Sequence, residues 1–245
     1  MEQQDVAHHW SRQFNEELEA VRTSVLTMGG LVEEQLKRAI LALVKGDSEL
    51  GEQVAHDDYK VNHLEVSIDE DCSRIIARRQ PTAGDLRLIV AVIKTITDLE
   101  RVGDEAEKIG YLAARLAVQE RPSDSYRSIQ HLADLVANML HRALDAFARM
   151  DPELAMRAVR EDEVVDQEYD ALLRQGITVM MEDPRTISRV LDTMWTARAL
   201  ERIGDHAKNI CEYVVYMVHG KDIRHLSLDD AERAVREGAD RRAAT

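Results

Sequence analysis

The stretch LERVGD at residues 99–104 returns as LERIGD at residues 200–205, so the second copy begins 101 residues after the first. The segments that end the neighbouring helices repeat at almost the same distance. Residues 46–49 (GDSE) match residues 150–153 (MDPE) with an offset of 104, and Pro81 matches Pro184 with an offset of 103. Three matches at nearly one offset indicate an internal duplication.

Apolar residues recur three and four positions apart along both copies, which is typical of amphipathic helices. Aromatic residues make up only 4% of the 245 residues, and the chain has only 11 Gly and 4 Pro, a composition that disfavours β-sandwiches. We therefore expect an all-α fold of two tandem three-helix bundles with six long helices. The first bundle is expected at residues 1–118, the second at residues 119–220, and a charged tail or short terminal helix at residues 221–245.

Prolines and capping residues place the expected breaks, because proline inside a helix removes a backbone hydrogen bond. The first helix is expected from Phe14 to Gly46, with residues 28–30 (MGG) marking a kink or tight packing. The second helix is expected to run without a break from Asp47 or Ser48 to about Arg78. Residues 121–124 (RPSD) are expected to open the fourth helix.

Charge and cysteine usage exclude several classes of protein. The net charge of −14 argues against a nucleic-acid-binding surface, which needs cations to neutralise phosphates. The N-terminus lacks the pattern of a secretory signal, and the longest apolar runs are too short to span a membrane. With Cys72 and Cys211 far apart and without metal-type spacing, we expect a cytoplasmic protein with reduced thiols.

Each copy of the repeated motif places two carboxylates on one helix face, because residues four apart point the same way. These pairs are Glu100 with Asp104 and Glu201 with Asp205. The repulsion within each pair and the intervening glycine both cost helix stability, so we expect either a closely packed neighbouring helix or a bound ion. The second helix of each half offers further oxygen ligands, namely Asp58, Asn62, Glu65 and Asp69 in the first half and Asp162 and Asp166 in the second. Such oxygen sets suit Mg, Mn, Ca or Fe.

The same acids also allow a simpler interpretation, in which they form ion pairs on a solvated helix surface. Asp104 lies four residues before Lys108, Asp205 three before Lys208, and Lys94 four before Asp98. His206 follows Asp205 but points to a different side of the helix. The Glu-x-x-His pairs of di-iron bundle enzymes are missing, and no Ser/His/Asp or Cys/His set can be assembled from the spacing, so we expect no enzymatic activity.

Several features together resemble the PhoU family, the accessory and regulatory proteins of bacterial phosphate-specific transport. They are the repeated motif, residues 28–34 (MGGLVEE), Asp58 and Asp162 in the second helix of each half, and residues 216–225 (YMVHGKDIRH). The resemblance extends from about Phe14 to His225. It implies two similar three-helix bundles, a homodimer, and acidic motifs that hold metal ions such as Mg, Mn, Fe or Zn. By position, the ligands would be Glu100, Asp104, Glu201 and Asp205, assisted by Asp58, Asp162 and Asp166.

The resemblance also implies a function, namely negative regulation of phosphate uptake and of the phosphate-starvation response. Such a protein would act on the cytoplasmic side of the inner membrane as an adaptor between two partners. These are the ATPase subunit of the phosphate-specific ABC transporter and a sensor histidine kinase. The two acidic sites are expected to differ, because Asn62 stands opposite Asp166, and Tyr169 stands opposite Glu65.

Two other functions remain open from the sequence. The first is storage or handling of metal or phosphate, in which the metal clusters themselves bind phosphate. The second is a chaperone-like helical binder, which the even spread of charge disfavours, because it predicts no exposed apolar groove.

Overall fold

The computed structural model describes residues 2–120 and 126–243, with side chains described over residues 12–120 and 126–239. Within these ranges every regular element is a helix. The elements are α1 (Glu2–Lys45), α2 (Ser48–Asp57), α3 (Tyr59–Arg79), α4 (Ala83–Ala117), α5 (Arg127–Arg149), α6 (Pro152–Glu182), the short 3₁₀ helix η1 (Pro184–Thr186), α7 (Ile187–His219) and α8 (Leu228–Ala243). The predicted all-α fold is confirmed.

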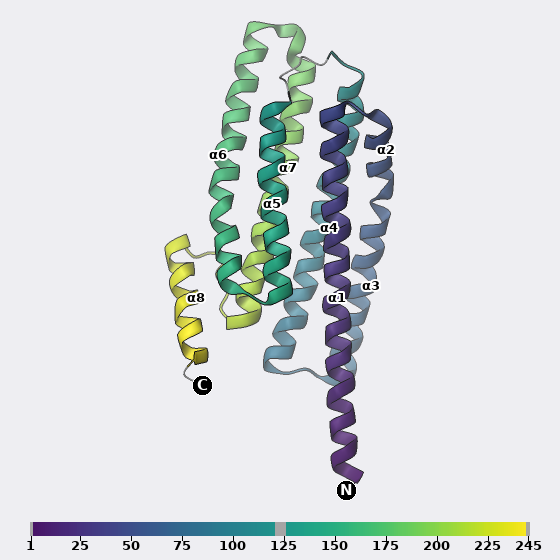
Figure 1. The fold of residues 1–245 in the computed structure, drawn as a ribbon, viewed down its shortest axis with the longest axis vertical. Coiled ribbons are helices and arrows are strands. Elements are labelled where there is room, and N and C mark those ends of the chain that lie inside the picture. Colours follow the sequence, from purple (N-terminus) through teal and green to yellow (C-terminus); the bar gives the residue numbers. More distant parts are fainter. Residues whose placement is uncertain (1, 121–125, 244–245) are drawn as a thin grey trace.

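The helices form two bundles that lie side by side (Figure 1). In the first bundle α1, α2–α3 and α4 pack together, and in the second α5, α6 and α7 repeat this arrangement. Helix α4 packs against α7, and α1 packs against α5, so the bundles share a broad interface. The buried apolar side chains of both halves form one continuous core. A division of the chain at residue 118 therefore stays a prediction from the duplication.

The capping residues act as the repeat predicts. The Asp47 carboxylate accepts a hydrogen bond from the backbone nitrogen of Leu50 at 3.0 Å and so caps α2. The Asp151 carboxylate accepts from the backbone nitrogens of Glu153 and Leu154 at 2.9 and 3.0 Å and caps α6. Pro122, which was expected to open the fourth helix, lies outside the described residues.

The prediction of one unbroken second helix is wrong, because the chain is interrupted at Asp58. The backbone nitrogens of Val61 and Asn62 both donate to the Asp58 carbonyl, at 2.9 and 3.3 Å, which tightens the turn between α2 and α3. The dihedral angles of Asp58 stay helical, so α3 continues in nearly the same direction. The corresponding helix of the second half, α6, is continuous. A candidate site residue therefore lies at a local irregularity that only one half contains.

Helix α1 begins at Glu2 rather than at Phe14, and it continues through residues 28–30 as a single helix. Tight packing explains the first of the two glycines there. A Cβ atom added to Gly29 would lie 2.6 Å from a methyl carbon of Leu144 in α5. Gly29 thus lets the two bundles approach each other.

The charged C-terminal segment forms a helix rather than a tail. Helix α8 packs on α6 and α7, with Ala231, Ala234 and Val235 buried. Arg160 of α6 forms an ion pair with Glu232 of α8. The second bundle thus gains a fourth helix that the first bundle does not have.

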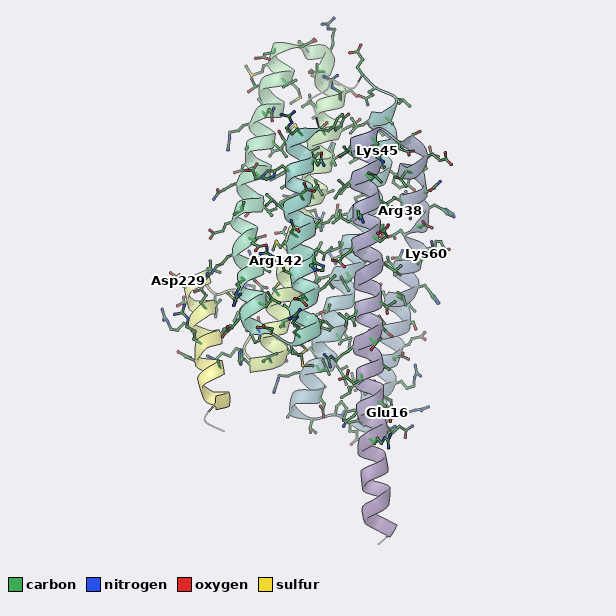
Figure 2. The ribbon with its side chains drawn as sticks, in the orientation of Figure 1. Glu16, Arg38, Lys45, Lys60, Arg142 and Asp229 are labelled. Atoms are coloured by element: carbon green, nitrogen blue, oxygen red, sulfur yellow. The ribbon has the colours of Figure 1, made fainter. Side chains whose placement is uncertain are left out.

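Charged side chains cover the outer surface of both bundles (Figure 2). Asp57 accepts from Arg38 of α1 at 2.8 Å and from Lys60 of α3 at 2.6 Å. Such partly exposed pairs near the surface typically contribute only about 1 kcal/mol or less each. Searched over the described residues, no helix has the length and apolar character needed to cross a membrane.

We expect the substitution Gly51→Ala to lower the free energy of unfolding by about 1–3 kcal/mol, as overpacking does in other cores. The new Cβ atom would lie 2.6 Å from the backbone oxygen of Gly110, and backbone cannot move aside as a flexible side chain can. The matched control is Gly30→Ala, whose Cβ would meet nothing within 4 Å and should gain up to about 1 kcal/mol of helix propensity. Urea denaturation of both variants tests this, and equal effects would contradict it.

Candidate metal centre

Three carboxylates converge in the first bundle. Asp58, at the junction of α2 and α3, faces Asp104 and Glu107 on α4, and one oxygen from each lies within 4.8 Å of the others. Asp58 is buried, whereas Asp104 and Glu107 are half-buried. The turn at Asp58 and the spacing of three residues on α4 bring the three groups to one place.

The surroundings of this cluster supply further oxygen atoms. The Asp58 carboxylate accepts from the side-chain nitrogens of Gln35 and Asn62, each at 2.9 Å. The side-chain oxygen of Gln35 is buried and has no hydrogen-bond partner among the described residues. Carboxylates and an unpaired amide oxygen are the ligands that hard divalent cations prefer. The residues therefore fit a site for such a cation, with Asp58, Asp104 and Glu107 as its ligands.

Both motif glycines lie where a neighbouring helix comes close. A Cβ atom on Gly103 would lie 2.9 Å from a carboxylate oxygen of Asp58 and 3.3 Å from Val61. On Gly204 it would lie 3.3 Å from Val165 of α6. Close helix packing, one of the two explanations expected for the glycines, is therefore present in both halves.

The carboxylates of the first bundle repel one another in a partly dehydrated environment. Burial and the negative charge of Asp58 raise the pKa of Asp104, and Lys108 acts in the opposite direction. Burial, Asp58 and Asp104 likewise raise the pKa of Glu107. Burial and the charge of Asp104 raise the pKa of Glu100. A divalent cation would relieve this repulsion.

The ion pairs expected within single helices are wrong in all three cases. Lys108 pairs with Glu105 at 2.9 Å instead of Asp104. Lys208 contacts Asp162 instead of Asp205, as described next. Asp98 pairs with His206 instead of Lys94. The predicted partners were wrong because sequence spacing alone does not decide which side chains pair. The direction of each side chain and its neighbours on other helices also decide it.

The second bundle holds its acids differently. The Lys208 ammonium lies 2.5 Å from an Asp162 oxygen, and Arg198 lies 2.7 Å from Glu201. Asp205 is exposed. Lys208 follows Glu107 by 101 residues, the offset of the repeated motif, so a cation replaces a carboxylate at this position. Across the part of the chain that the structure describes, no second group of three such ligands lies as close together.

The structure thus brings together part of the ligand set expected from the sequence. Asp58 and Asp104 meet, but the third member is Glu107, which the sequence reasoning did not select. Glu100 lies near enough for Asp58 and Asp104 to affect its pKa, yet it is not within the closest group. Asp166 also has a pKa raised by burial and by Asp162. Extending each motif by three residues, to Glu107 and Lys208, would have shown the difference between the halves.

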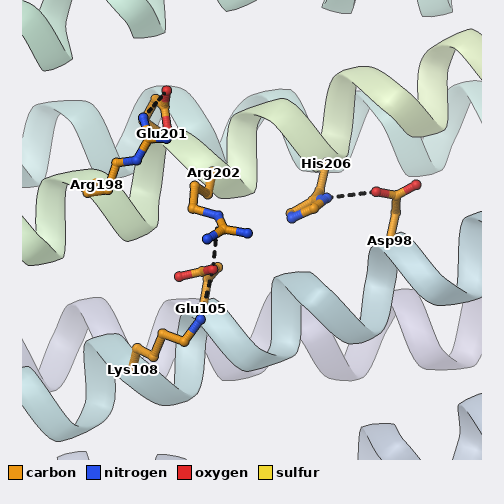
Figure 3. Close-up of polar contacts among 7 residues, drawn as sticks. All are labelled: Asp98, Glu105, Lys108, Arg198, Glu201, Arg202 and His206. Carbon is orange, nitrogen blue, oxygen red and sulfur yellow. Dashed lines mark hydrogen bonds and ion pairs between the residues drawn. The ribbon is translucent and has the colours of Figure 1, made fainter.

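The interface between the two bundles contains buried charges (Figure 3). Arg202 of α7 lies 3.2 Å from Glu105 of α4, and the Nδ1 atom of His206 lies 2.7 Å from an Asp98 oxygen. His206 thus faces α4, away from the acidic motif beside it, as predicted. The order of these contacts along the two helices shows that α4 and α7 run antiparallel.

The comparisons with known proteins agree with the duplicated architecture. The chain matches the PhoU domain twice, over residues 25–113 and over residues 129–214. The chain belongs to the PhoU family. Each match contains one copy of the repeated motif, and the two matches fall in the two bundles of this PhoU fold.

Relatives in the PhoU family are similar over nearly their full length. The chain is 51% identical over 225 residues to the "Phosphate-specific transport system accessory protein PhoU homolog" of Pseudomonas putida, covering 92% of this chain and 88% of that protein. It is 50% identical over 234 residues to the "Phosphate-specific transport system accessory protein PhoU" of Escherichia coli, covering 95% and 96%. The crystal structure of PhoU from Pseudomonas aeruginosa superimposes with a TM-score of 0.82 at 50% identity, covering 85% of this chain and 100% of that one. The phosphate transport system regulatory protein PhoU from Streptococcus pneumoniae gives 0.79 at 30% identity, covering 85% and 98%.

An exposed apolar stripe lies on α7 of this PhoU-family chain. Ile187, Leu191 and Trp195 follow one another at intervals of four residues and are 42%, 42% and 63% exposed. Side chains at this spacing share one helix face. The absence of an exposed apolar groove stays a prediction, because three exposed side chains on one helix face form a stripe and not a groove.

We expect Glu107→Gln to stabilise the PhoU-family chain when metal is removed, and only above about pH 4–5. The raised pKa of Glu107 means that protonation favours the folded state. The favourable contribution of Glu107 protonation to the free energy of unfolding is complete below the pKa that Glu107 has in the unfolded state. It is lost as the pH rises through the higher pKa that Glu107 has in the folded state. In a chelator, the midpoint of thermal unfolding of the variant should thus match that of the wild type near pH 4 and exceed it at pH 7.

Adding Mg²⁺ or Mn²⁺ at pH 7 should reduce or reverse this difference, because only the wild type keeps all three ligands. Glu163→Gln, at an exposed position on α6, is the control for removing one negative charge. An equal gain in stability from both variants would contradict the prediction, since it would reflect the net charge alone.

Proposed function

We propose that this protein is a negative regulator of phosphate uptake and of the phosphate-starvation response. It acts at the cytoplasmic face of the inner membrane, as an adaptor between the ATPase subunit of the phosphate-specific ABC transporter and a sensor histidine kinase. The observation that carries the proposal is the identity of 50% to the Escherichia coli accessory protein over 95% of this chain. That relative is named as an accessory protein of the phosphate-specific transport system.

The architecture is suited to an adaptor. Two bundles with a continuous core present long helical faces in a fixed relation. A regulator of this kind shifts its partners between states only through a difference in affinity for those states. A rigid body binds with higher affinity, because little conformational entropy is lost on binding.

The proposed metal ion belongs to the first bundle, where Asp58, Asp104 and Glu107 would hold it. When bound, it would neutralise the three carboxylates and link the α2–α3 junction to α4. Its role is therefore to fix the local geometry at the buried Asp58 in the first bundle. The oxygen ligands favour Mg²⁺ or Mn²⁺ over softer metals.

Deletion of the gene tests the regulatory role. Cells grown in abundant phosphate should then show high activity of the phosphatase that is normally induced by starvation, and the intact gene on a plasmid should restore low activity. An empty plasmid is the control. Low phosphatase activity in the deletion strain would refute the repressor role of this protein.

A second candidate function is storage or handling of metal or phosphate, and the three converging carboxylates are the observation that favours it. In this case the bound metal would itself hold phosphate. Purified protein should then bind phosphate in a fixed ratio, and chelation of the metal should abolish that binding. An adaptor without this function would show no chelator-sensitive binding of phosphate.

We also propose that the protein forms a homodimer, and the exposed stripe on α7 offers an apolar surface for this contact. Light scattering of the wild type should give twice the mass of the chain, and Trp195→Glu should give the monomer mass. A monomeric wild type would refute this part of the proposal.

A further inference from the structure

Helix α8 is an addition to the duplicated unit. The two matches to the PhoU domain end at residues 113 and 214, so α8 lies outside both, and Figure 1 shows it on the outer side of α6. The surface beneath it, here called the α8 seat, consists of Met156 and Arg160 of α6 with His219 and Lys221 at the end of α7. We propose that α8 is detachable and that the α8 seat also binds an amphipathic helix of a partner protein. The proposal does not rest on the regulatory function, because binding is measured on the purified protein.

The α8 seat has an apolar position where the first bundle is polar. Met156 lies one turn before Arg160 on the same face of α6, and it is only 5% exposed. Its counterpart in α2, at the offset of 104, is Glu52, which is exposed. The counterpart of His219, at the offset of 101, is Val118, which is 83% exposed. In the described part of the chain, the first bundle thus holds its three-helix packing without a cover on this face.

Two cations of the α8 seat bind glutamates of α8. The Nε atom of Arg160 donates to Glu232 at 2.5 Å. The ammonium of Lys221 lies 2.9 Å from Glu237 and 3.4 Å from the backbone oxygen of Ala234. The two glutamates are five residues apart, so they flank the buried face of α8 on its two sides. These contacts fix both the position and the direction of a helix in the seat.

The apolar contact that holds α8 is small. The buried residues of α8 are Ala231, Ala234, Val235 and Gly238. Helix α5 of the same bundle buries much larger side chains, such as Met139 and Phe147. Apolar burial stabilises in proportion to the area removed from water, and a segment with few such contacts opens more easily than the whole protein unfolds. We therefore expect α8 to open while the rest of the second bundle stays folded.

The connection before α8 permits this movement. Ile223 is buried and anchors the connection on the second bundle, whereas residues 224–227 are all exposed. The Ser227 hydroxyl accepts from the backbone nitrogen of Asp230 at 3.2 Å and caps α8. The N-terminal cap therefore belongs to α8 itself and does not depend on the α8 seat.

The contacts of α8 define the helix that can replace it. Such a helix has small apolar residues on one face and two glutamates, five residues apart, on either side of that face. An α8 from a second copy has no advantage over the resident helix, which its short connection keeps at high effective concentration. A different protein with further contacts outside the α8 seat would have that advantage. The expected partner is therefore a protein with an acidic amphipathic helix, bound as a helix in a groove.

A labelled peptide of residues 226–243 is the probe, and its fluorescence anisotropy reports binding to the full-length protein. Gly238→Ala in the protein should loosen the resident helix, because the new Cβ atom would lie 2.5 Å from Nδ1 of His219. We expect this variant to bind the peptide at least about tenfold more tightly than the wild type, in which the resident helix blocks the seat. Gly30→Ala, whose Cβ would meet nothing within 4 Å, is the control and should bind as the wild type does.

A charge exchange tests whether the peptide binds in the α8 seat. Adding Arg160→Glu to the Gly238→Ala protein should weaken binding by at least about tenfold, because Glu232 of the peptide then meets a like charge. A peptide with Glu232→Arg should restore the affinity. Arg174→Glu, at an exposed position farther along α6, is the matched control and should leave binding unchanged. Circular dichroism confirms that each variant is folded.

Hydrogen exchange followed by mass spectrometry measures the opening of α8 without the peptide. In the wild type, amides of residues 231–238 should exchange at least about tenfold faster than those of residues 203–214 in α7, and Gly238→Ala should accelerate only the former. Exchange of α8 as slow as that of α7 in both proteins, no binding of the peptide to Gly238→Ala, or binding that Arg160→Glu does not weaken would each overturn the proposal. A larger mass of Gly238→Ala than of the wild type in light scattering would overturn the choice of a different protein, because a second copy would then donate its α8.

Discussion

The substitution Arg115→Ala should lower the free energy of unfolding by about 3 kcal/mol, although most of the Arg115 side chain is exposed. Its guanidinium lies 2.8 Å from a carboxylate oxygen of Asp192 across the interface of the two bundles. The side chain of Asp192 is only 4% exposed, whereas that of Arg115 is 64% exposed. Removing the arginine would leave a buried carboxylate with Gln119, at 3.2 Å, as its remaining side-chain donor.

Substitution of the partner residue, Asp192→Asn, should lower the free energy of unfolding by less than Arg115→Ala does. A simple count of ion pairs would predict equal effects. After Asp192→Asn, the arginine can turn to solvent and no buried charge is left. The double variant Arg115→Ala with Asp192→Asn should accordingly be more stable than Arg115→Ala alone, because its buried group is neutral.

Urea denaturation of the four proteins in this cycle measures the effect. Arg149→Ala is the matched control, because Arg149 pairs with Asp145 on the surface, where both side chains are at least 36% exposed. This control should cost less than about 1 kcal/mol. An Arg115→Ala variant that is no less stable than Arg149→Ala would contradict the prediction.

The fold followed from the sequence to the extent that local signals specify it. The repeated motif, the caps at Asp47 and Asp151 and the helical periodicity led to the three-helix pattern in each half. The interruption at Asp58 did not follow, because it depends on a tightened backbone turn that leaves no mark on apolar spacing. The sequence did not distinguish a packed helix α8 from a free tail, because the apolar face of this segment is short.

The candidate site was less predictable, because its members come from different helices. Periodicity placed Asp58 and Asp104 on faces that can meet, but it does not give the rotation of α3 against α4. The Asp98–His206 contact depends on the antiparallel packing of α4 on α7. Spacing alone favoured Lys94 as the partner of Asp98, and the bundle interface supplied a closer one. Only the exchange of Glu107 for Lys208 was visible in the sequence, through the offset of 101 residues.

Because Lys208 stands where the first bundle has Glu107, we expect the substitution Lys208→Glu to create a second metal site. In the wild type the Lys208 ammonium lies 2.5 Å from Asp162, where a divalent cation would otherwise bind. Asp166 and Asp205 lie near Asp162, since burial and the charge of Asp162 raise the pKa of both. A glutamate at position 208 would restore the pattern of Asp58, Asp104 and Glu107.

The readout is the number of Mn²⁺ ions bound per chain in titration calorimetry. We expect one tight ion for the wild type and two for Lys208→Glu, and Asp58→Asn should lower the affinity of the first site by roughly 100-fold. The double variant Asp58→Asn with Lys208→Glu should bind one tight ion, now in the second bundle. Lys208→Met is the control, because it removes the cation without adding a ligand and should gain little affinity. Two tight ions in the wild type, or an unchanged number in Lys208→Glu, would show that Lys208 does not replace a metal in the second bundle.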